Sequence, residues 1–376
     1  MKWIEGNRSA PHGMAAAVRI GIEGGRIAQV VPYATASADL PVLSPGFVDV
    51  HVHGGGGADT MDASEAAFAR ICETHARFGT TSLLLTTVTD TPAQVDAVLR
   101  AAGDFIAHGP AGARAIGVHL EGPFLNPAKA GAQRSDLMTD ADPALAAGWF
   151  ATGVVRMITM APERGGAHEV ARMARARGIL VSAGHTDASA VDMQGAARAG
   201  FSHVTHLCNA MRPLLHRDIG PIGHVVADSA FTGDLICDGI HLDPTMVKTL
   251  VRAIGHERLM LITDAIRAAA VGEGEYDLGG LRVTVRDGAC RLANGTLAGS
   301  VLTMNRAWRL LQEFADVPRS LADAMAATNP AKRIGLANKG RIEVGYDADI
   351  TALDADADVL WTMVGGHVVY EKGGVS

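Results

Sequence analysis

Short apolar runs alternate with alanine-rich stretches of helical periodicity through most of the chain. Eight runs have the length and the flanking turn residues of buried strands. They lie at 46–53, 81–88, 114–122, 154–162, 178–186, 201–207, 234–242 and 258–266. Helical stretches separate most of them, at 63–78, 91–103, 167–177, 189–199 and 244–254. Eight strands that alternate with crossover helices predict an α/β fold, a (β/α)8 barrel of the TIM type.

The two ends of the chain follow another pattern. Residues 1–44 and 340–376 hold short runs of alternating apolar and polar positions, broken by Gly and Asp, and the first includes a Glu-Gly-Gly hairpin signal. Neither segment could bury a core alone, so we expect both termini together to form one small β-sandwich domain. The barrel would then cover 45–339 as the catalytic domain, with a β-hairpin insert at about 275–300. Two helices are expected after the insert, at 301–315 and 319–327.

Composition and charge narrow the class of partner. The formal net charge of the 376 residues is -7 and no basic run occurs, so we expect neither a nucleic-acid surface nor a membrane surface. A phosphate on a small molecule remains compatible, because it needs only one or two local cations. No apolar run approaches the length of a membrane span, and the first residues lack a signal-peptide pattern. The four cysteines form no CxxC pair, which is typical of reduced thiols. We therefore expect a cytoplasmic protein with a small-molecule substrate.

The stretch PGFVDVHVHGGGG, residues 45–57, ends the first apolar run with two histidines. Side chains alternate across a strand, so His51 and His53 point the same way and can hold one metal ion. The glycines that follow let the backbone turn sharply beside such an ion. Two solvated histidines at a strand end are the alternative on this stretch alone. A phosphate loop is a weak interpretation of the glycines, because no Walker or Rossmann spacing accompanies them.

Further metal-type side chains end other apolar runs. Glu121 ends the third, His185 the fifth and His206 the sixth, and Asp264 lies in the eighth. The active site of a (β/α)8 barrel lies at the carboxyl ends of its strands, so these residues are expected to meet. A buried lone carboxylate such as Glu121 is costly without a partner, which favours metal ligation or a catalytic role. A helix cap for His185 and a packed core position for His206 are the alternatives.

Asp264, in LITDAI, is the candidate acid–base. A carboxylate that faces a metal-bound water can take its proton and pass it to a leaving group. The alternative is a metal ligand only, and the two roles can coexist. His119 shares a face with Glu121 and is expected to pack behind the site, whereas His203 is expected to be structural.

Several motifs occur in series: PGFVDVHVHGGGG, HLEGPFLNPAKAGAQ, SAGHTDAS, THLCNAMRPLLHRDIG, CDGIHLDP, LITDAI and LAGS. Together they resemble the N-acetylglucosamine-6-phosphate deacetylases of the amidohydrolase superfamily, over nearly the whole chain. The C-terminal GRIEVGYDADITALD resembles the closing segment of that superfamily. The succession of EGPF, GHT, THLxNAM and DGIH is far more specific than the HxH pair alone.

The resemblance implies a metal-dependent hydrolase. It implies five metal ligands: Glu121, His185 and His206 for the main ion, with His51 and His53 for a second ion that some members hold. A divalent metal is expected, zinc in the first place, one or two ions per subunit. Many amidohydrolases bridge two ions with a carboxylated lysine on the fourth strand, but the fourth apolar run of this chain has no lysine. The resemblance therefore implies that Glu121 is the bridging or sole carboxylate. With Asp264 as acid–base, the expected reaction removes the N-acetyl group of N-acetylglucosamine 6-phosphate, giving glucosamine 6-phosphate and acetate in amino-sugar catabolism.

The resemblance also implies a set of substrate contacts: Ala132, Gln133, Asn209, Ala210, Arg217, His241, Leu297, Ala298 and Gly299. Arg217 matches the arginine that binds the phosphate. The family's working unit implies a homodimer with the phosphate pocket near the subunit interface. One residue departs from the family, because Gln133 stands where a substrate-contacting histidine is expected. A glutamine donates a hydrogen bond from its amide but cannot carry a positive charge. This departure is therefore expected to affect either the rate of the reaction or the identity of the preferred sugar.

Two other functions stay open at this point. The first is a related amidohydrolase that acts on N-acetylgalactosamine 6-phosphate or on another N-acyl amine. Gln133 keeps it open, whereas Arg217 favours a phosphorylated substrate. The second is an inactive metal-binding scaffold, which is disfavoured because Asp264 and every expected ligand are present.

Overall fold

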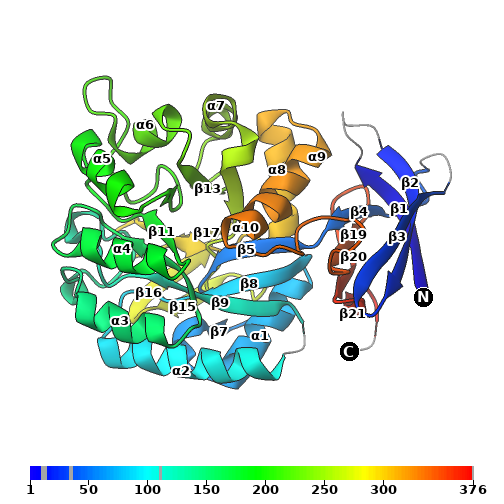
Figure 1. The fold of residues 1–376 in the computed structure, drawn as a ribbon, viewed down its shortest axis with the longest axis horizontal. Helices are drawn as coiled ribbons and strands as arrows, with labels where there is room; N and C mark the ends of the chain where they lie inside the picture. The colour runs from blue at the N-terminus through cyan, green and yellow to red at the C-terminus, as the bar shows by residue number, and fades with distance from the viewer. Residues whose placement is uncertain (10–14, 34–36, 110–111, 375–376) are drawn as a thin grey trace.

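The computed structural model describes residues 1–9, 15–33, 37–109 and 112–374. Its centre is a parallel sheet of eight strands in the order β14-β13-β12-β11-β10-β9-β8-β5 (Figure 1). A parallel bridge between Val52 and Ala265 brings the two end strands together, so the sheet is a nearly closed barrel. The predicted (β/α)8 barrel is confirmed. The strands are β5 (Phe47–Val52), β8 (Thr80–Thr86), β9 (Arg114–Glu121), β10 (Val155–Met160), β11 (Leu180–Ala183), β12 (His203–Val204), β13 (Thr232–Ile236) and β14 (Leu259–Ile262).

Helices surround the barrel, and all five that the periodicity predicts are present. They are α1 (Glu65–Ala76), α2 (Pro92–His108), α4 (Ala167–Ala176), α5 (Ala190–Ala199) and α7 (Pro244–Ile254). The sequence did not predict α3 (Pro143–Ala151) or α6 (Gly220–Ala227). After the insert come α8 (Met304–Ala315), α9 (Arg319–Asp323), a π-helical turn (Ala324–Thr328) and α10 (Asn329–Arg333). Short 3-10 turns lie at Thr60–Asp62, Pro127–Lys129, Ser135–Leu137 and His256–Arg258. Among the described helices, none combines the length and the apolar character needed to cross a bilayer.

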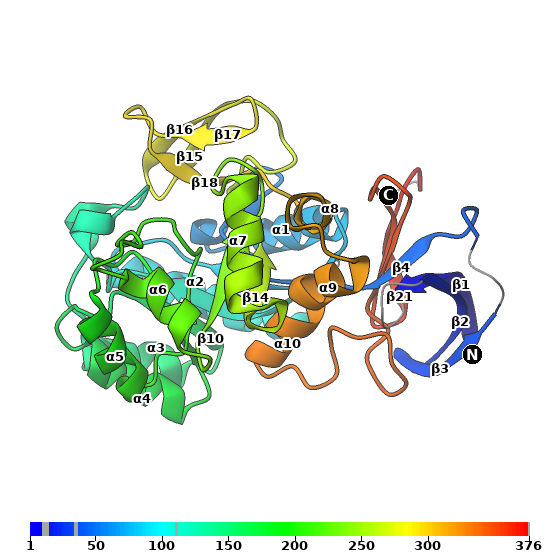
Figure 2. The ribbon, with the colours of Figure 1, turned by 90° about the horizontal axis from the view of Figure 1, so that it is seen from above.

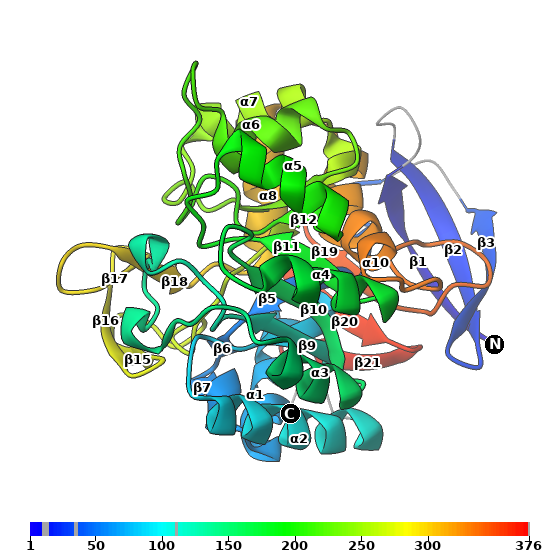
Figure 3. The ribbon, with the colours of Figure 1, turned by 60° about the vertical axis from the view of Figure 1, so that its left-hand side comes forward.

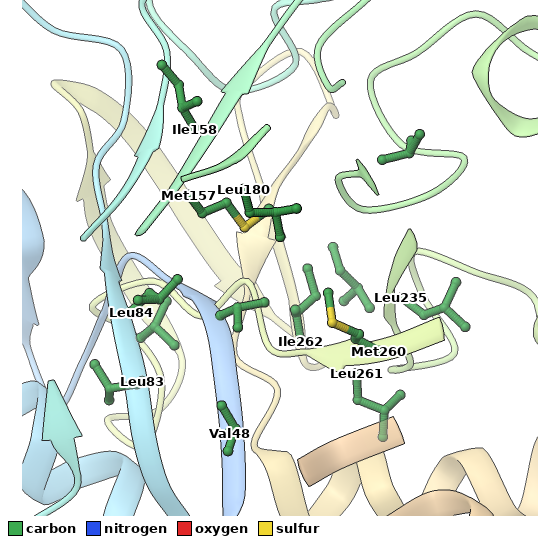
Figure 4. Packing of buried hydrophobic residues seen from close by; sticks show 14 of the residues in the cluster. Val48, Leu83, Leu84, Met157, Ile158, Leu180, Leu235, Met260, Leu261 and Ile262 are labelled. Atoms are coloured by element: carbon green, nitrogen blue, oxygen red, sulfur yellow. The ribbon is translucent and has the colours of Figure 1, made fainter. Parts of the chain in front are cut away.

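Apolar side chains from both faces of the barrel strands form one large core. Figure 4 shows some of them: Val48, Leu83, Leu84, Met157, Ile158, Leu180, Leu235, Met260, Leu261 and Ile262. Strands that are buried on both faces appear in a sequence as near-continuous apolar runs, which is why these eight can be recognised.

Both ends of the chain build one seven-stranded sheet beside the barrel, in the order β21-β20-β19-β4-β1-β2-β3 (Figure 1). The N-terminal strands are β1 (Lys2–Ser9), β2 (Ala15–Glu23), β3 (Arg26–Pro32) and β4 (Val42–Pro45). The C-terminal strands are β19 (Ile350–Leu353), β20 (Val359–Val364) and β21 (His367–Glu371). Antiparallel pairing of β4 with β19 joins the two ends, and side chains such as Ile20, Ile27, Ile350 and Met363 share one core. The small β domain from both termini is therefore confirmed.

The predicted insert is a four-stranded antiparallel sheet of its own. Its strands are β15 (Gly274–Leu278), β16 (Leu281–Arg286), β17 (Ala289–Arg291) and β18 (Leu297–Ser300). They share a small core with Val88 and Ala132, which follow β8 and β9, and with Ile266, which follows β14. The insert therefore covers the carboxyl ends of the barrel strands, away from the small β domain (Figure 2). Figure 3 shows the same separation from another side. A two-residue hairpin, β6 (Gly54–Gly55) with β7 (Ala58–Asp59), follows His53 at this end.

Candidate metal and catalytic site

Two histidines leave the end of β5 on one face, as strand alternation requires. The Nε2 atoms of His51 and His53 are 3.1 Å apart, and both side chains are buried. The backbone N–H of His53 donates to the carbonyl of Ala265 at 2.9 Å, which ties this end of β5 to the segment after β14. The first pair of predicted ligands is therefore assembled by the closure of the barrel.

Glu121, the last residue of β9, lies between that pair and a second one. Its Oε1 is 3.1 Å from Nε2 of His206 and 3.2 Å from Nε2 of His185. Oε1 is also 3.6 Å from Nε2 of His51, and Oε2 is 3.4 Å from Nε2 of His53. Two groups of buried donor atoms thus share one carboxylate: His51, His53 and Glu121 form one, and Glu121, His185 and His206 form the other.

Three of the predicted site residues have backbone angles in the left-handed region. The φ angles are 46° at His185, 35° at His206 and 52° at Asp264. Such angles are unfavourable for residues other than glycine and cluster at functional sites, where the surrounding structure holds them. Here the N–H of Asp264 donates to the carbonyl of His51 at 3.0 Å, and the N–H of His206 donates to the side chain of Asp234. The barrel ends thus fix the direction in which each functional side chain points.

The hydrogen bonds of the imidazole rings test whether a metal ion fits. Nδ1 of His53 lies 3.2 Å from the carbonyl oxygen of Thr86, and Nδ1 of His185 lies 3.0 Å from that of Lys129. A carbonyl oxygen accepts only, so each Nδ1 carries a hydrogen, and Nε2 of each ring faces Glu121 with a lone pair that a proton or a metal ion can occupy. Lone pairs that converge on a carboxylate repel one another unless positive charge lies between them. Imidazole nitrogen with carboxylate oxygen is a donor set for zinc and similar divalent ions, so the residues present fit such an ion.

The protonation equilibria show the same demand for positive charge. Burial disfavours a charged imidazole, but hydrogen bonds to Asp264 and Glu121 outweigh it and raise the pKa of His53 to about 10. The pKa of His206 rises to about 9, because its bond to Glu121 likewise outweighs burial. Burial alone would raise the pKa of Glu121, but the charges of the surrounding histidines hold it well below its usual range. The site therefore stabilises the ionised forms of Glu121 and Asp264 together with positive charge between them. Either protons on the histidines or divalent ions can supply that positive charge.

Asp264 faces the first pair of histidines. Its Oδ1 is 3.2 Å from Nε2 of His53 and 3.4 Å from Nε2 of His51. Burial opposes ionisation, but the charge of His51 and the hydrogen bond with His53 lower the pKa of Asp264 below its ordinary value. The carboxylate is therefore ionised and lies beside the donor atoms where an ion would bind.

A cavity of about 340 Å³ opens onto these residues at the carboxyl ends of the strands. His53, Glu121, His185, His206 and Asp264 form its floor. Seven of the predicted substrate contacts also line it: Ala132, Gln133, Asn209, Ala210, His241, Leu297 and Gly299. The structure therefore gathers most of the predicted site in one place.

Three predicted residues lie outside the cavity lining. His51 lies behind His53, where its ring packs against His119 with centroids 4.7 Å apart. Ala298 points into the core of the insert, because it alternates with Leu297 along β18. Arg217 is exposed on the segment between β12 and α6 and does not reach the cavity of its own chain.

Several lining residues were not predicted from the sequence. Arg291 contributes a guanidinium from the insert, where its Nη1 donates to the carbonyl of Gly295 at 2.8 Å. Thr296 lies next to it on the lining, and Val88, Ile236 and Leu278 add apolar surface. No spacing rule marks Arg291, because its place follows from the fold of the insert over the barrel.

Buried polar groups behind the lining orient several of its members. Asp238 Oδ2 lies 2.7 Å from Nδ1 of His241, and that hydrogen bond outweighs burial and lowers the pKa of Asp238. A hydrogen on Nδ1 leaves Nε2 of His241 for a ligand in the cavity. His119 sits 2.7 Å from the hydroxyl of Thr159, and burial lowers its pKa well below the usual value, so it is neutral. His119 therefore packs behind the site, as expected.

The comparisons with known proteins agree with this geometry. The sequence model of the amidohydrolase family matches residues 42–369, and the chain belongs to that family. It is 39% identical over 366 residues to the N-acetylglucosamine-6-phosphate deacetylase of Bacillus subtilis (strain 168). The match covers 93% of this chain and 92% of that protein. It is 32% identical over 341 residues to the N-acetylgalactosamine-6-phosphate deacetylase of Escherichia coli O157:H7, across 90% of each chain.

A solved structure extends the likeness to the whole fold. A mutant of N-acetyl-D-glucosamine-6-phosphate deacetylase from Mycobacterium smegmatis, in complex with N-acetyl-D-glucosamine-6-phosphate, has a TM-score of 0.91 and 33% identity. The match covers 98% of this chain and 100% of that one. The barrel, the insert and the small β domain therefore occur together in a protein of this kind.

Proposed function

We propose that the protein is a metal-dependent hydrolase that removes the acetyl group of N-acetyl-D-glucosamine 6-phosphate. The products are D-glucosamine 6-phosphate and acetate, and the reaction belongs to amino-sugar breakdown. The observation that carries the proposal is the pair of metal-type groups that share Glu121, with Asp264 beside them on the floor of the cavity. The similarity to deacetylases across more than nine-tenths of the chain supports the substrate class.

The ligand atoms define where divalent ions would be held. Glu121, His185 and His206 would hold one ion, and Glu121 with His51 and His53 would hold a second. We propose zinc, with one or two ions per subunit, because three protein ligands leave a position for water or substrate. Such an ion lowers the pKa of a water molecule and polarises a carbonyl group.

Asp264 would act as the acid–base. Its ionised carboxylate accepts a proton from the attacking water, and the hydroxide adds to the acetyl carbonyl carbon. The protonated carboxyl then gives the proton to the amine nitrogen as the carbon–nitrogen bond breaks. Asp264 ends the cycle ionised, and the proton has moved from water to the amine.

The rest of the cavity would position the sugar. His241 presents Nε2, and Asn209 and Ala210 line the wall beside it. Arg291 is the guanidinium on the lining and would bind the phosphate, for which a planar charged donor is well suited. Holding the phosphate fixes the amide over the ionised Asp264.

We also propose that the working unit is a homodimer. Arg217 is exposed on a segment where Leu214 and Leu215 are 50% and 55% exposed, and an apolar surface of this kind suits a subunit contact. Arg217 could then reach the phosphate in the cavity of a second copy. Sedimentation velocity of the wild type against a Leu214→Glu, Leu215→Glu variant tests the dimer. A monomeric wild type would contradict it.

We place the enzyme in the cytoplasm. All four cysteines fall within the described residues and are free. Burial raises the pKa of the Cys72 and Cys237 thiols to about 12, so they remain protonated core side chains. Free buried thiols suit a reducing compartment.

A second candidate substrate is N-acetylgalactosamine 6-phosphate. The Escherichia coli relative that bears this name, and Gln133 in place of the family histidine, favour it. The deciding experiment compares kcat/KM for the two phosphosugars and for unphosphorylated N-acetylglucosamine. A preference for N-acetylglucosamine 6-phosphate supports the proposal, and a preference for the galactosamine compound replaces it. Equal kcat/KM values for N-acetylglucosamine with and without the phosphate would show that the enzyme does not recognise the phosphate.

A further inference from the structure

Gln133 lines the cavity, but both ends of its amide are hydrogen-bonded by the protein. Its Oε1 accepts hydrogen bonds from the backbone N–H of Thr89 at 2.7 Å and from the Thr89 hydroxyl at 2.5 Å. Its Nε2 donates to Oε2 of Glu121 at 2.5 Å. The side chain is 8% exposed. A chain of hydrogen bonds thus runs from Thr89 through Gln133 to the carboxylate that both metal groups share.

The backbone N–H of Thr89 and the carboxylate of Glu121 fix which way the amide faces. If the amide of Gln133 turned over, its NH2 group would meet the N–H of Thr89 and its carbonyl would meet the carboxylate of Glu121. Both of these contacts would become repulsive, whereas the Thr89 hydroxyl can donate or accept. The amide therefore has one stable orientation, in which a hydrogen points at Oε2. A histidine ring could not replace it fully, because one ring nitrogen offers a single lone pair to the two donors of Thr89.

The local backbone is built to bring Thr89 this close. Gly122 follows Glu121 with φ of 86°, and a Cβ on it would lie 2.3 Å from the Thr89 hydroxyl oxygen. Only glycine leaves room for the hydroxyl at that position without strain. Thr89 follows β8 and Gln133 follows β9, so the contact joins two neighbouring strand ends. The placement depends on the fold of both segments.

We propose that Gln133, oriented by Thr89, is a positioning residue for Glu121. Gln133 holds Oε2 of Glu121 by one hydrogen bond. This bond directs Oε1 of Glu121 at His185 and His206 and keeps Oε2 3.4 Å from Nε2 of His53. A carboxylate shared between two ions has to be fixed at both oxygens, and groups behind the ligands commonly provide this. This role rests on the proposed function for the presence of the ions, and it replaces a substrate contact as the main task of Gln133.

Zinc binding to the full-length chain tests the role without any sugar. Dissociation constants are measured by competition with a chromogenic chelator, together with the number of ions bound. Gln133→Leu is expected to weaken at least one ion by about 10- to 100-fold. Thr89→Val removes one donor at nearly constant volume and is expected to weaken the same ion by a smaller factor. Thr89→Ser keeps the hydroxyl and is expected to bind as the wild type does.

Thr249→Val is the matched control, because the hydroxyl of Thr249 donates to the Thr245 carbonyl on the exposed face of α7. It is expected to bind zinc as the wild type does. Wild-type constants in Gln133→Leu, with only a higher KM for the phosphosugar, would overturn the proposal in favour of a substrate contact. If Gln133→Leu does not fold, as a thermal melt would show, Thr89→Val decides. Unchanged zinc binding in Thr89→Val would overturn the role of Thr89.

The zinc-binding test of Gln133 does not depend on whether the wild type catalyses the proposed reaction. If the wild type releases no amine from either phosphosugar, the proposed function fails. The zinc constants of the variants still decide whether Gln133 positions Glu121.

Discussion

At the scale of single residues, the metal-type side chains could be predicted because each one ends an apolar run. Parallel strands bring their carboxyl ends together, so separate motifs converge without any knowledge of distances. The proposed roles of Gln133 and Arg291 could not be predicted in the same way. Gln133 depends on a threonine 44 residues away, and Arg291 depends on how the insert folds over the barrel. Contacts between loops leave no periodic signal in a sequence.

The Asp264→Asn variant tests the acid–base at this scale. Asparagine keeps the shape and the φ of 52° but cannot take a proton from water. We expect kcat to fall by about 100- to 10,000-fold with zinc content unchanged. The control is Asp316→Asn, at an exposed aspartate with φ of 55°, which should keep the wild-type kcat. Undiminished turnover in Asp264→Asn would remove the assignment.

The Arg291→Met variant tests the phosphate contact. A charge-assisted hydrogen bond contributes about 1.5 to 3 kcal/mol, so the KM for the phosphosugar should rise by about 10- to 100-fold. The KM for the unphosphorylated sugar should not change. Arg282→Met is the control, because Arg282 lies on the same insert and its side chain is 84% exposed. Equal effects on both sugars would show that Arg291 does not read the phosphate.

At the scale of elements, the barrel strands are predictable because they are buried on both faces, whereas two helices are not. The helix α3 has nine residues, PALAAGWFA, which are all apolar or small, so no polar face gives it a helical periodicity. The eight residues of α6 include two glycines, which disfavour a helix in isolation. Tertiary packing forms both helices where local propensity does not.

The Val285→Ala variant tests the insert as a cover for the cavity. Val285 is buried in the core of the insert, and removing two methyl groups costs about 1 to 2 kcal/mol. Amide exchange across 274–300 should become about 5- to 30-fold faster, and the KM for the phosphosugar should rise because β18 carries part of the lining. Val344→Ala, at a side chain that is 62% exposed, is the control. Unchanged exchange with unchanged KM would argue against this role.

At the scale of the whole molecule, the small β domain could be predicted because neither terminal segment can bury a core alone. How it attaches to the barrel could not be predicted. The hydroxyls of Thr351 and Thr362 donate to the carbonyls of Gly79 and Ala76, each at 2.7 Å, and all are buried. Gly79 and Ala76 lie at the end of α1, just before β8, so the sheet is fixed to the element that begins the second barrel strand. We therefore expect the two domains to unfold together.

The Thr362→Val variant tests that attachment. It removes one of the two hydrogen bonds that the buried carbonyl of Ala76 accepts, since the N–H of Gly79 also donates to it at 3.1 Å. The loss should cost about 0.5 to 1.5 kcal/mol of unfolding free energy in one cooperative urea transition. The control Thr284→Val, whose hydroxyl donates to Glu275 on the surface of the insert, should lose little. Two separate transitions in the wild type would show that the domains are not coupled.

The central claim is that one shared carboxylate holds the ions that make this cavity a deacetylase. The most direct measurement is amine release from N-acetylglucosamine 6-phosphate while zinc is added back to the metal-stripped protein, with Glu121→Gln beside it. We predict that the rate rises with the number of ions bound and that Glu121→Gln binds zinc weakly and stays inactive. Full activity in the metal-stripped protein, or in Glu121→Gln, would contradict the account.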